Sequence, residues 1–293
     1  MQTLLLESFQ AAVAPADPLW VIAPHLPSPP KGRTVVVGAG KAAASMARAV
    51  ENAWPADAPL SGVVVTRYRH GLALSRIRCL EAAHPVPDSA GEDASREILA
   101  LARDLGPDDL MIALVSGGGS SLLSLPVPGV SMDDLKAVTQ ALLRSGAPIE
   151  SMNVVRKHLS QVQGGRLVAA TRAPVLGLII SDVAGDDPSA IASGPTVADP
   201  STYSDALAIL ARYEVDTPES VAAWLQAGAA GEHAETPKPD DPLFQRVDNR
   251  MIATAQQSLQ AGAAVFERAG IRTVVLGDTV TGEAREVAKV YAA

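Results

Sequence analysis

Short apolar runs rich in β-branched residues alternate along the chain with longer amphipathic segments. The runs contain few polar interruptions, which is typical of strands in a parallel sheet covered on both faces. They predict strands at residues 34–37, 62–66, 110–115, 175–180 and 273–276. Helical patterns occupy residues 42–54, 90–105, 132–144, 154–169, 203–213 and 249–269. The alternation predicts an α/β fold: a doubly wound, mostly parallel sheet with helices on both faces.

The residue composition of the chain changes near residue 229. Gly, Pro and charged residues replace the apolar pattern over 229–242, which predicts a linker after a Rossmann-like α/β domain at 1–228. Residues 243–293 are expected to hold a helix, a strand and a second helix, which opens near Thr281 and runs to Ala293. Roughly fifty residues bury too little surface to fold alone. We therefore expect 243–293 to be the start of a second α/β domain, truncated here.

The composition and net charge of the chain limit the kinds of molecule that it is expected to bind. The 293 residues are 47% hydrophobic and carry a formal charge of −8, which argues against nucleic acid or an anionic membrane as the main partner. A small anion is not excluded, because it needs only a few local cations and backbone amides. No apolar run is long enough for a membrane span, and the start of the chain lacks the pattern of an export signal.

Cysteine usage points to the compartment. Cys79 is the only cysteine, so no internal disulfide and no Cys-based zinc site can form. This fits a cytoplasmic location. Oligomeric state, including a homo-oligomer, stays open, because one chain shows no interface.

Two glycine-rich turns follow predicted strands, where doubly wound sheets bind their ligands. The first turn contains Gly38, Gly40 and Lys41 and matches the looser dinucleotide fingerprint Gly-x-Gly-x-x-Ala. A lysine in the first helical turn interacts unfavourably with the positive end of the helix dipole, at a cost of roughly 0.3–1 kcal/mol. A bound anion at that helix end would make the interaction of the lysine with its surroundings favourable. The other interpretation is a tight turn with a solvated lysine.

The second turn offers backbone amides and hydroxyls to an anion. Its residues are Ser116, Gly117, Gly118, Gly119, Ser120 and Ser121. A flexible loop without a ligand is the alternative, and its position directly after a core strand favours the phosphate-binding interpretation.

Two further segments carry candidate chemistry. Asn153, Arg156 and Lys157 share a polar helix face that could meet a carboxylate or phosphate, although a solvated basic face is the usual explanation. Asp182 follows the strand at 175–180 and is the candidate catalytic carboxylate, with Asp187 beside it as a second ligand for Mg²⁺. Turn formation is an equally good explanation of Asp187.

Together these segments resemble the glycerate 2-kinase family, whose members were often labelled hydroxypyruvate reductases and carry a C-terminal MOFRL domain. The matching motifs are Val37-Gly38-Ala39-Gly40-Lys41-Ala42, His84-Pro85-Val86-Pro87-Asp88, Ser116-Gly117-Gly118-Gly119-Ser120-Ser121, Asn153 with Arg156-Lys157-His158-Leu159-Ser160, Gly164-Gly165-Arg166, Ser181-Asp182-Val183 and Ser193-Gly194-Pro195-Thr196.

The resemblance implies transfer of the γ-phosphoryl group of ATP, with Mg²⁺, to the 2-hydroxyl of D-glycerate, in a cleft between two domains. It implies that Lys41 is needed for activity, and that Asp182 binds the metal or orients the hydroxyl. Arg156 and Lys157 would receive the glycerate carboxylate. Family members continue through a C-terminal domain that has no counterpart in these residues, so a fragment is expected.

An NAD(P)-dependent hydroxypyruvate reductase is the rival interpretation. It would use Gly38, Gly40 and Ala43 as a dinucleotide turn, with Arg67 or Arg69 receiving a 2′-phosphate. The position of Lys41 counts against it, as does the lack of an acidic residue at the end of the second strand. A non-catalytic nucleotide-binding half is a further alternative.

Overall fold

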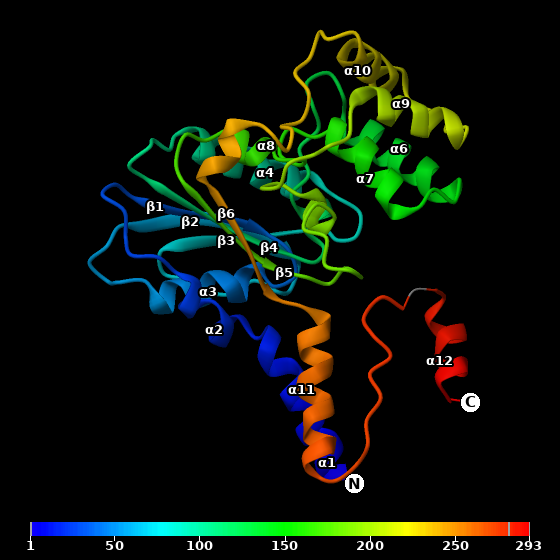
Figure 1. Ribbon diagram of the computed structural model, residues 1–293. Helices are drawn as coiled ribbons and strands as arrows, with labels where there is room; N and C mark the ends of the chain where they lie inside the picture. The colour runs from blue at the N-terminus through cyan, green and yellow to red at the C-terminus, as the bar shows by residue number, and fades with distance from the viewer. Residues whose placement is uncertain (1, 281, 293) are drawn as a thin grey trace.

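Within the residues that the structure describes, six parallel strands form one sheet, in the spatial order β3-β2-β1-β4-β5-β6 (Figure 1). The computed structural model describes residues 2–280 and 282–292. The strands are β1 (Thr34–Ala39), β2 (Leu60–Arg67), β3 (Ile77–Ala82), β4 (Leu110–Ser116), β5 (Val175–Ile180) and β6 (Val247–Ala253). This is the order of the doubly wound dinucleotide-binding fold, in which the direction of winding reverses between β1 and β4. The predicted fold class is confirmed.

Helices cover both faces of the sheet, because the central strands are apolar on both sides. Val35 and Val37 of β1 pack in the core that includes α4 (Ser89–Arg103), whereas Val36 packs in the core that includes α3 (Ala43–Ala53). The two cores lie on opposite faces, since successive side chains of a strand alternate. Short helices α2 (Pro18–Val21), α5 (Gly119–Leu122) and α8 (Arg166–Ala169) complete the layers, together with four 3₁₀ turns in the described part of the chain.

Four further helices form a separate apolar cluster beside the sheet (Figure 1). They are α6 (Met132–Arg144), α7 (Ile149–His158), α9 (Tyr203–Arg212) and α10 (Glu219–Ala229). The single helix predicted at 154–169 is wrong: α7 ends at His158, and a second helix, α8, starts at Arg166. Gly164 and Gly165 between them have φ values of +57° and +77°, which a continuous right-handed helix cannot accommodate.

A pair of long helices projects from the sheet at the lower edge of Figure 1. Helix α1 (Gln2–Val13) packs along α11 (Ala255–Arg268), and Ser8 Oγ donates to the Gly262 carbonyl at 3.0 Å. Helix α12 (Ala284–Ala292) follows an extended segment; Thr281 and Ala293, the expected bounds of that helix, lie outside the described residues. None of the helices in the described residues is both long and apolar enough to cross a bilayer.

The helix predicted at 249–269 begins too early. Residues Val247–Ala253 form strand β6 and pair with β5, so part of the predicted second unit belongs to the main sheet. The helix starts at Ala255, where Thr254 Oγ accepts from the Gln257 amide and the Gln257 side chain caps in return. Whether the residues after α11 begin a second domain stays a prediction.

The strand predicted at 273–276 is wrong. The segment lies outside every strand of the described chain, and the side chains of Val274 and Leu276 are 70% and 62% exposed. An apolar run becomes a strand only where a neighbouring strand satisfies its backbone N–H and C=O groups.

Candidate active site

The carboxyl ends of β1 and β4 lie side by side at the centre of the sheet, where the winding direction reverses. β1 leads into Lys41, and β4 leads into the loop at 116–121. The Lys41 amide donates to the Gly117 carbonyl at 2.9 Å, and the Ala42 amide donates to Ser116 Oγ at 3.1 Å. The structure thus joins the two glycine-rich turns at the position where this fold leaves room for a ligand.

Glycine is required for this close approach. Gly40 has a φ of +139°, and a Cβ built there would lie 2.1 Å from Ser116 Oγ. A Cβ on Gly38 would lie 2.5 Å from the Leu114 carbonyl oxygen of β4. Both glycines therefore allow the two strand ends to meet.

Lys41 and Asp182 meet over the loop. Lys41 Nζ donates to Asp182 Oδ2 at 2.9 Å, and the two side chains are 43% and 45% exposed. A Cβ on Gly117 would lie 1.8 Å from Asp182 Oδ2, so the carboxylate rests directly on that glycine. An ammonium, a carboxylate and the glycine loop therefore share one accessible surface.

The serine hydroxyls of the loop differ in whether they are free to donate a hydrogen bond to a ligand. Ser116 Oγ is occupied by the Ala42 amide, and Ser121 Oγ donates to the Gly118 carbonyl at 3.2 Å. Both residues are buried. Ser120 is half-buried, and its Oγ lies 3.0 Å from Ser193 Oγ. Ser120 is thus the loop hydroxyl best placed to donate to a ligand.

His84, from the His84-Pro85-Val86-Pro87-Asp88 motif, lies at the same surface. A Cβ on Gly118 would lie 2.8 Å from His84 Nε2 and 3.3 Å from Lys41 Cγ. Partial burial, assisted by the charges of Lys41 and Arg67, lowers the pKa of His84, while Asp182 opposes the shift. The one available signal was the position of the His-Pro turn directly after β3.

The lowered pKa of His84 predicts a pH effect on stability. The unfolded chain takes up a proton at His84 below about pH 6.5, whereas the folded chain resists it, so the free energy of unfolding should fall between pH 7.5 and 5.5. Urea unfolding at the two pH values measures the fall. His84→Gln should make it smaller, and an identical fall in this variant would contradict the prediction. Carboxylates whose pKa values are lowered in the fold also reduce the free energy of unfolding as the pH falls, but they do so below about pH 5, outside this range.

Asn153 and Arg156 have different surroundings. Asn153 is buried, and its Oδ1 lies 3.3 Å from Ser193 Oγ, so it lies behind the loop. Arg156 is half-buried and lines a cavity of about 240 Å³ together with Pro85 and Val86, which follow His84. Burial lowers the pKa of the Arg156 guanidinium.

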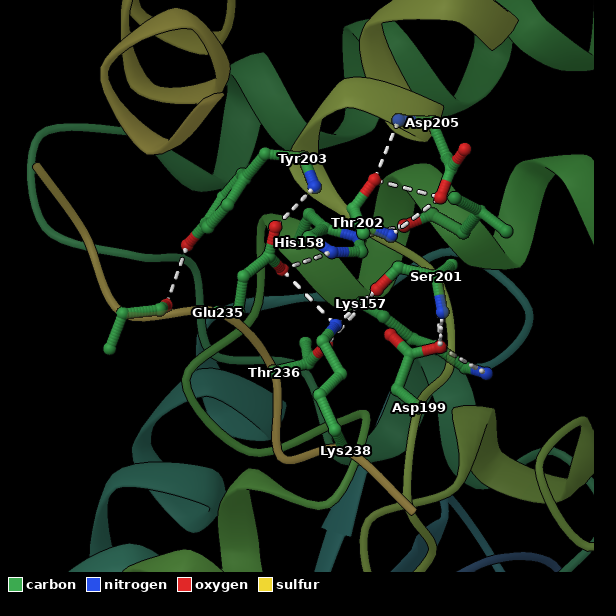
Figure 2. Close-up of polar contacts among 12 residues, drawn as sticks. Lys157, His158, Asp199, Ser201, Thr202, Tyr203, Asp205, Glu235, Thr236 and Lys238 are labelled. Atoms are coloured by element: carbon green, nitrogen blue, oxygen red, sulfur yellow. Dashed lines mark hydrogen bonds and ion pairs between the residues drawn. The ribbon is translucent and has the colours of Figure 1, made fainter. Parts of the chain in front are cut away.

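Lys157 points away from this surface. Its Nζ lies 3.6 Å from Asp199 Oδ1, and both side chains are buried. Figure 2 shows it within a polar cluster that also contains Ser201, Glu235 and Lys238, on the side of α7 that faces the 199–205 segment. The structure does not bring Lys157 together with the other predicted substrate-binding residues.

The carboxylates after β5 are arranged unequally. Asp182 reaches the glycine loop, whereas both oxygens of Asp187 accept from Ser189, from its amide and its hydroxyl at 2.8 Å each. Within the described residues no group of three or more His, Cys, Asp or Glu side chains could hold a metal ion. A metal carried by substrate phosphates needs only one or two carboxylates, and Asp182 fits that requirement better than Asp187.

Comparison with known proteins identifies the family. A family model described as "Domain of unknown function (DUF4147)" matches residues 4–226. A D-glycerate 2-kinase from Thermotoga maritima is 37% identical over 295 residues, which cover 100% of this chain and 68% of that protein. The chain belongs to the glycerate 2-kinase family. The resemblance inferred from the motifs is confirmed.

Other relatives carry two different names. A glycerate 2-kinase from Pyrococcus horikoshii is 43% identical over 87% of this chain and 57% of its own length. A protein named putative hydroxypyruvate reductase from Agrobacterium vitis is 53% identical over 97% of this chain and 63% of its own length. The crystal structure of a T. maritima glycerate kinase superposes with a TM-score of 0.82 at 35% identity, covering 94% of this chain and 64% of that chain. The chain thus spans about two thirds of these relatives or less.

Proposed function

We propose that this chain supplies the nucleotide-binding part of a glycerate 2-kinase, which transfers the γ-phosphoryl group of ATP to the 2-hydroxyl of D-glycerate. The observation that carries the proposal is the meeting of Lys41, the 116–121 loop and Asp182 at the central strand ends. Relatives of 37–43% identity that are named glycerate 2-kinase support it.

The chemistry suits this set of groups. Phosphoryl transfer depends on positioning and on neutralising phosphate charge, with little covalent work for the protein. The Lys41 ammonium would lie against the phosphates, and Ser120 and the loop amides would donate to their oxygens. Asp182 would accept the proton of the attacking 2-hydroxyl or hold the metal.

Mg²⁺ is the cofactor that the proposed reaction requires. When bound, it neutralises and orients the phosphate oxygens of ATP. Asp182 would hold it, because this carboxylate is half exposed and rests on the glycine loop where the phosphates would bind. We place Asp187 outside this role, since Ser189 occupies its two oxygens.

We assign the carboxylate of glycerate to Arg156. Its guanidinium makes no hydrogen bond or ion pair within the described residues, although it is half-buried. A carboxylate would supply the missing acceptors in bidentate geometry. The cavity that it lines adjoins the His84 turn, which lies on the loop.

The proposed reaction is tested by two parallel assays. Protein, D-glycerate and Mg·ATP should yield ADP and 2-phosphoglycerate, with the phosphate position assigned by ³¹P NMR. When the protein is mixed with hydroxypyruvate and NADPH, the NADPH should not be oxidised. NADPH consumption without ADP formation would refute the kinase. ATP binding without turnover, even with the C-terminal part of a relative supplied, would favour a non-catalytic nucleotide-binding half.

The reductase remains the second candidate, favoured by the name of the 53% identical relative and by the strand order. A bound dinucleotide would place its ribose at the end of β2, where this chain has Arg67. Arg67 would suit a 2′-phosphate, so NADPH rather than NADH is the cofactor to test.

Asp182→Asn tests the carboxylate. The substitution should raise the Mg²⁺ concentration needed for half-maximal rate if Asp182 holds the metal. If the residue takes the hydroxyl proton, it should lower kcat by about 10²–10⁴-fold. Initial rates across a Mg²⁺ titration measure both effects. Asp57→Asn, an exposed aspartate, is the control, and a wild-type titration curve for Asp182→Asn would remove the residue from the mechanism.

A further inference from the structure

A second layer of buried side chains supports the 116–121 loop from behind. Gln163 Nε2 donates to the carbonyl oxygens of Ser120 and Leu123 at 2.9 and 3.0 Å. Ala192 and Ser193 contact the loop from the turn that follows the Asp182 segment, and both are almost fully buried. All three residues are buried, whereas Lys41 and Asp182 are partly exposed.

The turn in this layer has an unusual backbone. Ala192, Ser193 and Gly194 are three consecutive residues in the left-handed region, with φ values of 51°, 58° and 60°. Only Gly194 adopts this conformation without penalty, because the left-handed region is unfavourable for residues that carry a Cβ. Backbone strain of this kind persists where the surroundings hold it in place.

The surroundings that hold the turn are two glycines. The Gly164 amide donates to the Ser193 carbonyl at 2.9 Å, and the Gly165 amide donates to the Gly194 carbonyl at 2.8 Å. These two hydrogen bonds give the Gly164-Gly165 pair of the family motif a structural role.

The strained conformation presents two groups to the loop. A Cβ built on Gly119 would lie 2.5 Å from the Cβ of Ala192, so the Ala192 methyl group packs directly against the Gly119 backbone. Ser193 Oγ lies 3.0 Å from Ser120 Oγ and 3.3 Å from Asn153 Oδ1. A serine has one hydroxyl proton, so Ser193 can donate to only one of these acceptors at a time.

We propose that Ser193 is a positioning residue that prepares Ser120 to donate to a phosphate oxygen. When Ser193 donates to Ser120 Oγ, the proton of Ser120 is turned outward, toward the half-exposed side of the loop. An anion that accepts this proton makes Ser120 Oγ a better acceptor in turn, since linked hydrogen bonds polarise one another. Without an anion, Asn153 Oδ1 takes the Ser193 proton. The inference rests on the proposed function, because it needs a phosphate at the loop.

Binding of Mg²⁺ with AMPPNP, a non-hydrolysable ATP analogue, tests the relay in the 293-residue chain by calorimetry. Ser193→Ala and Ser120→Ala should each raise Kd by about five- to tenfold, which is the effect of losing one hydrogen bond in the relay. The double variant should bind as weakly as Ser120→Ala alone, because the two hydroxyls act in series. Ser95→Ala is the matched control: Ser95 is also fully buried, and its hydroxyl donates to the Gly91 carbonyl within α4.

Ser193→Gly separates positioning from stability. It removes the hydroxyl and the left-handed strain together, so the unfolding temperature should not fall, whereas Kd for AMPPNP should still rise. A merely structural serine would show wild-type affinity in this variant. Wild-type affinity in Ser193→Ala, or losses that multiply in the double variant, would overturn the relay and leave the kinase proposal standing. Absence of binding by the unmodified chain would overturn both.

Discussion

In a version completed with the C-terminal domain of a relative, Lys41→Ala should lower the rate of ADP formation from ATP and D-glycerate by at least about a hundredfold, the usual effect of removing one group that stabilises developing charge. Lys41 is the cation that lies over the glycine loop, and its partner Asp182 cannot replace it. The fold should be unaffected, because exposed ion pairs contribute about 0–1 kcal/mol. Initial rates together with a thermal melt measure both quantities.

Lys31→Ala is the matched control for this experiment. Lys31 is an exposed lysine that precedes β1 and lies at the opposite end of the strand from Lys41. Its removal changes the net charge of the protein by the same amount but should leave the rate unchanged. A rate for Lys41→Ala within about twofold of the wild type would show that the ammonium takes no part in the reaction.

Gly40→Ala should destabilise the protein by about 2–5 kcal/mol and abolish AMPPNP binding. The estimate combines left-handed strain with overpacking, because the new Cβ would lie 2.5 Å from the Ser116 carbonyl oxygen as well as close to its hydroxyl. Backbone cannot rotate away as a side-chain tip can. The β1 turn and the loop should therefore separate. Urea unfolding and calorimetry measure the two losses.

Gly129→Ala separates strain from contact. Gly129 has a φ of +85°, but nothing lies within 4 Å of a Cβ built there. This variant should lose only about 1–2 kcal/mol and keep its affinity for AMPPNP. Equal losses in the two variants would mean that the close approach of Gly40 to Ser116 has no energetic consequence.

The central strands could be predicted from the sequence, whereas the edge strands could not. β1, β2, β4 and β5 have neighbours on both sides and both faces covered, so they are continuous apolar runs. β3 and β6 are the two edges. Charged residues interrupt both of them, Arg78 and Glu81 in β3 and Asp248 and Arg250 in β6. Charges on edge strands discourage pairing with other chains, and they also remove the pattern from which a strand is predicted.

Much of the candidate site was predictable because it depends on strand ends. Gly40, Lys41, the 116–121 loop and Asp182 all follow central strands, and parallel strands deliver their ends to one edge. Lys157 shows what was not predictable. Its spacing from Asn153 and Arg156 suggests one shared face, but the orientation of a helix is decided by distant partners. Asp199, which lies far along the chain from Lys157, holds it inside the protein.

The pairing of α1 with α11 also affects how the chain is made. Ser8 and Gly262 are 254 residues apart, so a ribosome adding about 5–20 residues per second releases α1 roughly 10–50 s before its partner exists. Throughout that interval Leu5, Leu6 and Phe9, which remain 55–68% exposed even in the finished fold, have no intramolecular cover from α11. Helix α1 is therefore without its partner helix during that interval, and packing against α11 can stabilise it only after the intervening sheet has been synthesised.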